Sequence, residues 1–142
     1  MLYHNVTPRK TLMGTIRHDA DLLVELESLC VREMISLGRV EAIGAVQRAC
    51  VAYYDQAVRE YRQITLQRHM EIASLIGNVS LKDGQPFVHA HAVFTDEEGR
   101  AVGGHLCQGT VVFACEFLLT VLDGPEFTRE YDAQTGLRLW RL

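Results

Sequence analysis

The sequence predicts an α+β domain with a largely antiparallel β-sheet flanked by few helices, and two observations carry that prediction. One stretch of helical periodicity, residues 18–38, is followed by short apolar and β-branched runs that are typical of strands. Turns rich in Asp and Gly separate those runs at 82–86, 96–99, 123–126 and 133–136. Turns at such regular intervals are expected between consecutive antiparallel strands.

Length and cysteine content favour one ordinary domain spanning residues 1–142. The chain is 48% hydrophobic and 23% charged, which is enough to bury a core without disulfide bonds. Its four cysteines form no Cys-x-x-Cys pair, and no signal peptide precedes them, so we expect reduced thiols and a cytoplasmic location.

Charge and hydropathy argue against membrane and nucleic-acid partners. The longest apolar run, residues 111–122, carries Glu116 and is well short of the roughly 20 residues of a membrane span. The net charge is −4 and the arginines are scattered along the chain, so no basic footprint for nucleic acid is visible.

The first elements are a short strand in residues 10–17 and then one amphipathic helix. The helix is predicted from an apolar stripe at three-to-five-residue spacing, formed by Leu22, Leu26, Leu29, Met34 and Leu37. Asp19 is placed to accept hydrogen bonds from the first free N–H groups, and Gly38 can adopt the left-handed conformation that ends a helix.

Residues 40–49 and 50–58 are predicted to be short strands, with Gly44 at a bulge or a close backbone approach. Tyr53, Tyr54 and Tyr61 are expected to be packing residues.

The run from Thr110 to Val121 separates by parity. Its odd-numbered side chains are all apolar, whereas Thr110, Glu116 and Thr120 lie on the other parity. One face of this strand should therefore meet the core, and the other a helix, a cavity or another subunit.

The segment "FVHAHAVF", residues 87–94, places two histidines on one face of a predicted strand, because side chains at i and i+2 point the same way. His105 follows Gly103 and Gly104, and a hairpin could bring it beside His91. Three imidazoles that converge are a common ligand set for zinc and leave a fourth coordination position open.

A metal site open at one coordination position is one of several possible roles for the three histidines. Cys107 could be a fourth ligand that closes the site, or the histidines could be hydrogen-bonded to neighbours without any metal. Glu116 is a candidate partner for a histidine N–H, a candidate general base, or one half of a salt bridge. Motifs of zinc proteases, serine hydrolases, P-loop proteins and dinucleotide-binding proteins are absent.

Residues 71–124, from "EIASLIGNVS" through "PFVHAHAVF" and "GGHLCQG" to Glu116, resemble the plants-and-prokaryotes-conserved (PPC) domain. Plant members of this family carry the domain after AT-hook motifs in nuclear DNA-binding proteins, and prokaryotes have it as a stand-alone chain. The resemblance implies an α+β fold assembled as a trimer. It also implies a histidine cluster at His89, His91 and His105 that holds a metal in some members.

Two departures limit what the resemblance implies. The chain has no Arg-Gly-Arg-Pro core of an AT-hook, and residues 68–73 keep only Glu71 and Ile72 of the Gly-Arg-Phe-Glu-Ile-Leu segment that plant members use for contacts with nuclear proteins. A trimer would also carry three times the negative charge of one chain, which disfavours duplex DNA.

Three hypotheses follow. The first is a trimeric regulatory or DNA-associated binding module whose histidines hold a divalent metal, with zinc the best fit. The second is a metal-dependent hydrolase or lyase that uses the same histidines with Glu116 as the proton-transfer group. The third is direct DNA binding through arginines such as Arg59, Arg62 and Arg68.

Overall fold

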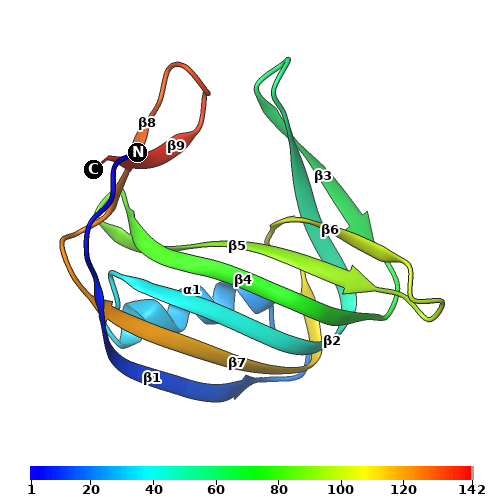
Figure 1. The fold of residues 1–142 in the computed structure, drawn as a ribbon. Helices are drawn as coiled ribbons and strands as arrows, with labels where there is room; N and C mark the ends of the chain where they lie inside the picture. The colour runs from blue at the N-terminus through cyan, green and yellow to red at the C-terminus, as the bar shows by residue number, and fades with distance from the viewer. Residues whose placement is uncertain (142) are drawn as a thin grey trace.

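The computed structural model describes residues 1–141 and shows a curved β-sheet with a helix packed against one face (Figure 1). In chain order the elements are β1 (Thr7–Ile16), α1 (Leu22–Arg32), β2 (Gly38–Asp55), β3 (Glu60–Leu66), β4 (Met70–Lys82), β5 (Gln85–Thr95), β6 (Ala101–Leu106), β7 (Val111–Asp123), β8 (Thr128–Tyr131) and β9 (Arg138–Arg141). All four predicted turns fall between consecutive strands. The α+β expectation is confirmed, with one helix in the described residues.

The strands follow the order β1-β7-β2-β6-β5-β4-β8-β9, with β3 paired to β2. Every pair is antiparallel except β4–β8, which is parallel. The long strand β2 pairs with β4 and β7 along its first part and with β3 and β6 along its last part. Strands β2, β4, β5 and β6 therefore close a ring of pairings, which fixes β6 against both β5 and β2.

Strand β2 unites the two short strands expected at 40–49 and 50–58. It bends at Gly44, where the pairing with β4 shifts register between Ala42 and Gly44. Gly44 has φ 140°, and an added Cβ would lie 2.2 Å from the carbonyl oxygen of Ala114. Both parts of the prediction for Gly44, a bulge and a close approach, are confirmed.

The ends of helix α1 differ from the prediction. Asp21, not Asp19, is the N-cap, and its carboxylate accepts hydrogen bonds from two backbone N–H groups of the first turn. Asp19 lies in the preceding turn with φ 63°. The helix ends at the C-cap Glu33, so Gly38 does not terminate it but begins β2.

The apolar stripe of the helix is confirmed in its first turns. Leu22 and Leu26 are fully buried against the sheet, as expected. Met34 lies beyond the helix end and is 85% exposed, so its place in the stripe was wrong. The helical period no longer applies there because the chain has turned toward β2.

The parity prediction for β7 fails at the start of the strand. Phe113 is 58% exposed, whereas its neighbour Val112 is fully buried, and Thr110 is buried as well. The β2–β7 pairing shifts register twice near Val46, and the shift between Ala45 and Val46 leaves Phe113 as an extra residue in β7, which exchanges the faces of the β7 residues before and after it. From Cys115 onward the odd-numbered residues Leu119 and Val121 face the core as expected.

Two hairpins rise on either side of β5 and β6 (Figure 1). We call them the β2–β3 arm, residues 49–66, and the β8–β9 arm, residues 128–141. They contact each other, because the Tyr54 hydroxyl donates to the carbonyl oxygen of Thr135 at 2.7 Å and Arg59 donates to that of Ala133 at 3.2 Å. The arms thus stand over the face of the sheet opposite the core.

Within residues 1–141, no helix has both the length and the apolar character needed to cross a membrane.

Candidate metal centre

Strand alternation decides where the first two histidines lie. On β5, Val88, Ala90 and Ala92 are buried in the core on the side of α1. His89 and His91 alternate with them and therefore lie on the opposite face, between the two arms. The sequence prediction that both rings share one face is confirmed by this burial pattern.

The third histidine, His105, lies on β6. His91 and His105 are direct partners in the antiparallel β5–β6 pair, as the predicted hairpin required. Gly103 and Gly104 make the approach possible, because an added Cβ at either would lie 2.7 Å from a backbone carbonyl oxygen of a neighbouring strand. Only residues without a side chain fit β6 between β5 and β2 at these positions.

The three rings form one compact group. One candidate ligand atom from each of His89, His91 and His105 lies within 4.8 Å of the others. The ring centroids are 5.0 to 5.6 Å apart. The Nδ1 atom of His105 is buried without a hydrogen-bond partner in the described residues. A buried nitrogen without a partner is costly, and coordination of a cation would satisfy it, so these residues fit a metal ion.

Burial and nearby positive charge favour the uncharged form of two of the rings, those of His89 and His105. Burial, the nearby charge of Arg129 and the other two histidines together lower the pKa of His89 from 6.5 to about 4, and burial is the largest cause. Burial also lowers the pKa of His105, with His91 and Arg129 contributing. The neutral imidazole is the form that binds metals, so at neutral pH His89 and His105 are ready to bind without first losing a proton.

Arg129 of β8 contacts the cluster directly. Its Nη2 lies 3.2 Å from Nδ1 of His89. A guanidinium can only donate, so Nδ1 must accept and the ring proton must sit on Nε2. Coordination of a metal through Nε2 of His89 would require the other tautomer, in which Nδ1 carries the proton and can no longer accept from Arg129. Metal binding through Nε2 would therefore release this donor of Arg129.

Cys107 does not join the group. Strand β6 ends at Leu106, one residue before Cys107, and the group of candidate ligand atoms does not include the Cys107 thiol. Its thiol points to the carbonyl oxygen of His105 at 3.5 Å, and burial raises its pKa to about 11. Among residues 1–141, the cluster contains three histidines and no cysteine.

Glu116 lies apart from the histidines within one chain. It is exposed on β7, and the pairings place β2 and β4 between β7 and β5. Three strand spacings correspond to about 14 Å across the sheet. The structure therefore does not bring Glu116 beside the cluster of its own chain.

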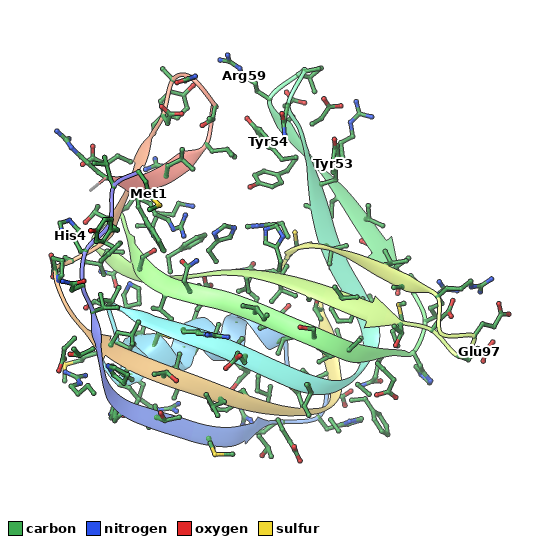
Figure 2. All side chains as sticks on the ribbon, viewed as in Figure 1. Met1, His4, Tyr53, Tyr54, Arg59 and Glu97 are labelled. Carbon is green, nitrogen blue, oxygen red and sulfur yellow. The ribbon has the colours of Figure 1, made fainter. Side chains whose placement is uncertain are left out.

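A hollow of about 320 Å³ opens beside the cluster and is bordered by both arms. Its walls include Tyr54, Tyr61, Lys82, His89, His105 and Arg129. In Figure 2, Tyr54 and Arg59 lie on the β2–β3 arm, whose upper end approaches the β8–β9 arm. We call this hollow the basic pocket, because Arg59 and Arg138 also line it. A second, more apolar hollow of about 520 Å³ borders His89 and His91 from the side of the N-terminal segment.

The tyrosines were only partly understood from the sequence. Tyr61 stacks near His105, with ring centroids 5.0 Å apart, and Tyr54 lines the same pocket. Tyr53, by contrast, is 62% exposed, so its expected packing role was wrong. Sequence reasoning also missed Lys82 and Arg129 as residues of the site. No local signal could have found Arg129, because β8 is placed near the cluster by its pairing with β4.

These features define a class: a small β-sheet domain that presents three imidazoles in an open hollow. The chain belongs to the Plants and Prokaryotes Conserved (PCC) domain family, which it matches over residues 3–123. The suspected family resemblance is thereby confirmed. The match ends before the β8–β9 arm, which carries Arg129.

Solved structures agree with this assignment. A metal-containing protein from Archaeoglobus fulgidus is 37% identical, with full coverage of both chains and a TM-score of 0.95. A plant- and prokaryote-conserved protein from Pyrococcus horikoshii is 36% identical over 100% of this chain and 98% of that one, with a TM-score of 0.93. A protein from Ralstonia eutropha JMP134, described as a presumed DNA-binding protein, is 30% identical over 92% of this chain and 90% of that one, with a TM-score of 0.83.

One curated relative is a larger protein. The bifunctional protein GlmU from a Synechococcus strain is 31% identical over 118 residues, which are 82% of this chain. The matched part makes up only 18% of that relative's length.

Proposed function

We propose that this chain is a metal-binding PPC module in which His89, His91 and His105 hold one divalent cation that presents an open coordination position to a small ligand. The observation that carries the proposal is the convergence of three imidazoles, one with an unsatisfied buried nitrogen, at the edge of a hollow. Nitrogen ligands of this kind suit zinc best among the common divalent ions. The metal-containing relative from Archaeoglobus fulgidus supports the same proposal.

The number of ligands argues for binding or sensing over a purely structural metal. Structural zinc sites are closed by four protein ligands, whereas sites that take a ligand use three and leave one position free. With Cys107 outside the group, three histidines remain. A cation held there would act as a Lewis acid toward an oxygen of the ligand.

The test is elemental analysis of protein purified without a metal-affinity tag. The triple variant His89→Ala, His91→Ala, His105→Ala removes the cluster, and the matched control replaces the chain's other three histidines, His4, His18 and His69. We expect close to one zinc per chain in the wild type and the control, and almost none in the cluster variant. A wild type that stays metal-free after incubation with zinc would refute the proposal.

We further propose that the chain assembles as a homotrimer through the outer face of the sheet, which is the face opposite α1. This face exposes large apolar side chains, of which Met13 is 79%, Ile43 58% and Ile76 54% exposed. Apolar exposure of this extent on neighbouring strands is typical of an interface. Sedimentation equilibrium tests the mass, and Ile43→Glu together with Ile76→Glu should dissociate the assembly if this face is used.

The second candidate is a metal-dependent hydrolase or lyase at the same cluster, and it is favoured by the pocket beside the histidines. Because Glu116 lies about 14 Å away across the sheet of its own chain, it could transfer protons at a cluster only from a neighbouring copy. Glu116 is exposed on the outer face near Ile43, where such a copy would bind. Glu116→Gln would then abolish turnover in the assembled protein while leaving its metal content unchanged.

Direct DNA binding has less support. Arg62 pairs with Asp55 at 2.6 Å, and Arg68 pairs with the buried carboxylate of Asp96 at 3.3 Å. Arg59 donates to a backbone carbonyl of the β8–β9 arm. Phosphate contacts would have to displace these partners. Retardation of duplex DNA at low salt that weakens steeply as salt rises would establish binding, and its absence would exclude this function.

A further inference from the structure

The basic pocket holds positive charge that the protein itself does not neutralise. Arg129 is only 7% exposed, and no carboxylate in residues 1–141 forms a salt bridge with it. Its guanidinium donates to Ser80 Oγ at 3.0 Å, to Asn78 Oδ1 at 2.8 Å and to the carbonyl oxygen of Arg138 at 3.3 Å. All these acceptors are neutral. A buried charge without a counter-charge is expensive, so Arg129 is poised for an anion.

A second cation stands directly beside it. Lys82 and Arg129 are register partners in the parallel β4–β8 pair. Like charges placed opposite each other on neighbouring strands are destabilising. Lys82 forms no salt bridge within the described residues, and its Nζ lies over the Phe87 ring at 4.8 Å. The fold therefore keeps two cations together at one wall of the pocket.

The rest of the basic pocket offers no carboxylate to Lys82 or Arg129. No Asp or Glu of residues 1–141 lines it, although Asp83 at its rim pairs with Arg138 at 3.0 Å. The tyrosines Tyr54 and Tyr61 add polar edges to the wall. This cationic pocket sits in a chain of net charge −4, so the positive potential is concentrated at the site where a ligand would enter.

The geometry points to a small anionic ligand in the basic pocket, a carboxylate or a phosphate group bound by Lys82 and Arg129 beside the histidine cluster. This inference rests on the proposed metal site for the chemistry next to the anion, but not for the anion site itself. The volume of about 320 Å³ suits a small molecule and not a polymer.

The two sites support each other. A divalent cation on the histidines would add positive charge a few ångströms from Arg129, and the shared anion would offset both. Metal coordination through Nε2 of His89 would also free the Nη2 donor that now contacts Nδ1. We therefore expect an anion to bind more tightly to the zinc-loaded protein than to the metal-free protein.

The test uses Trp140, the chain's one tryptophan, whose ring lies 5.5 Å from the Arg129 guanidinium. Its fluorescence is followed while metal-free and zinc-loaded protein are titrated with acetate and with inorganic phosphate, each against chloride at equal ionic strength. We expect a saturable change with at least one of the two anions. The preferred anion identifies the ligand's charged group.

Variants assign the binding to the pocket. Lys82→Gln and Arg129→Gln should each weaken anion binding at least about tenfold, the usual effect of losing one charged hydrogen-bond partner. Lys82→Gln decides the matter if the buried Arg129 variant fails to fold. The matched control is Lys10→Gln, which removes a lysine that pairs with Glu33 far from the pocket.

The outcomes separate this inference from the proposed function. If no saturable change occurs with either anion, or if Lys82→Gln binds as the wild type does, the anion site is refuted even when zinc binds. If the metal-free protein binds the anion through Lys82 and elemental analysis finds no zinc, the anion site stands and the metal proposal fails.

Discussion

Acidification should destabilise this protein through His89, and the size of the effect can be worked out from its surroundings. Burial lowers the pKa of this ring to about 4, against 6.5 for the free side chain, and a proton would also remove the acceptor that Arg129 now contacts. Because the folded pKa lies below the unfolded one, the unfolded chain binds more protons as the pH falls. The stability is therefore fully present above pH 6.5 and is lost as the pH falls toward 4.

The expected loss follows from the two pKa values. Between pH 7 and pH 5, His89 alone should lower the free energy of unfolding by about 2 kcal/mol. The assay is urea denaturation of chelator-treated protein at both pH values, for the wild type and for His89→Gln, which cannot be protonated. The wild type should lose about 2 kcal/mol more than the variant. Equal losses in the two proteins would mean that His89 is not held neutral by its burial and by Arg129.

Three further predictions concern the frame of the site, its helix and its metal. Gly104→Ala should reduce zinc affinity by at least tenfold, because the new Cβ would lie 2.7 Å from the Ala52 carbonyl oxygen and displace β6. Isothermal titration calorimetry measures this affinity. The control variant Gly14→Ala, whose new Cβ meets only a side-chain ring, should bind zinc normally. Asp21→Ala should lower the free energy of unfolding by about 1 to 2 kcal/mol through loss of the helix cap, and a change below 0.3 kcal/mol in urea denaturation would contradict the assignment of the cap. Free zinc at 100 times its dissociation constant should stabilise the protein by about 2.7 kcal/mol in a thermal unfolding scan, and a chelator should reverse the gain; no shift would mean that the folded chain does not bind zinc.

The sequence alone determined those features that depend on local spacing. Alternation with period two placed His89 and His91 on one face, and the structure shows Ala90 and Ala92 on the opposite face, in the core. The paired glycines before His105 indicated a close backbone approach, and β6 makes such an approach to both β2 and β5. Turn residues marked four of the five connections between consecutive strands from β4 to β9, because their backbone conformations are set within a few residues, whereas the connection between β6 and β7 was not predicted.

Local spacing failed where pairing with a distant strand decides the outcome. The faces of Phe113 and its neighbours depend on a bulge that arises where β7 pairs with β2, and the end of β6 before Cys107 depends on how β6 pairs with β2. Neither property is visible in the residues themselves, since the period of a strand is interrupted by its partner.

The charged half of the site was decided only by tertiary structure. Arg129 is 40 residues from His89 in sequence, and nothing near it signals a role beside the histidines. The β8–β9 arm brings it there by pairing in parallel with β4, which also sets it beside Lys82. The sequence thus determined which residues could hold a cation, whereas the three-dimensional arrangement of strands determined the positive pocket next to them.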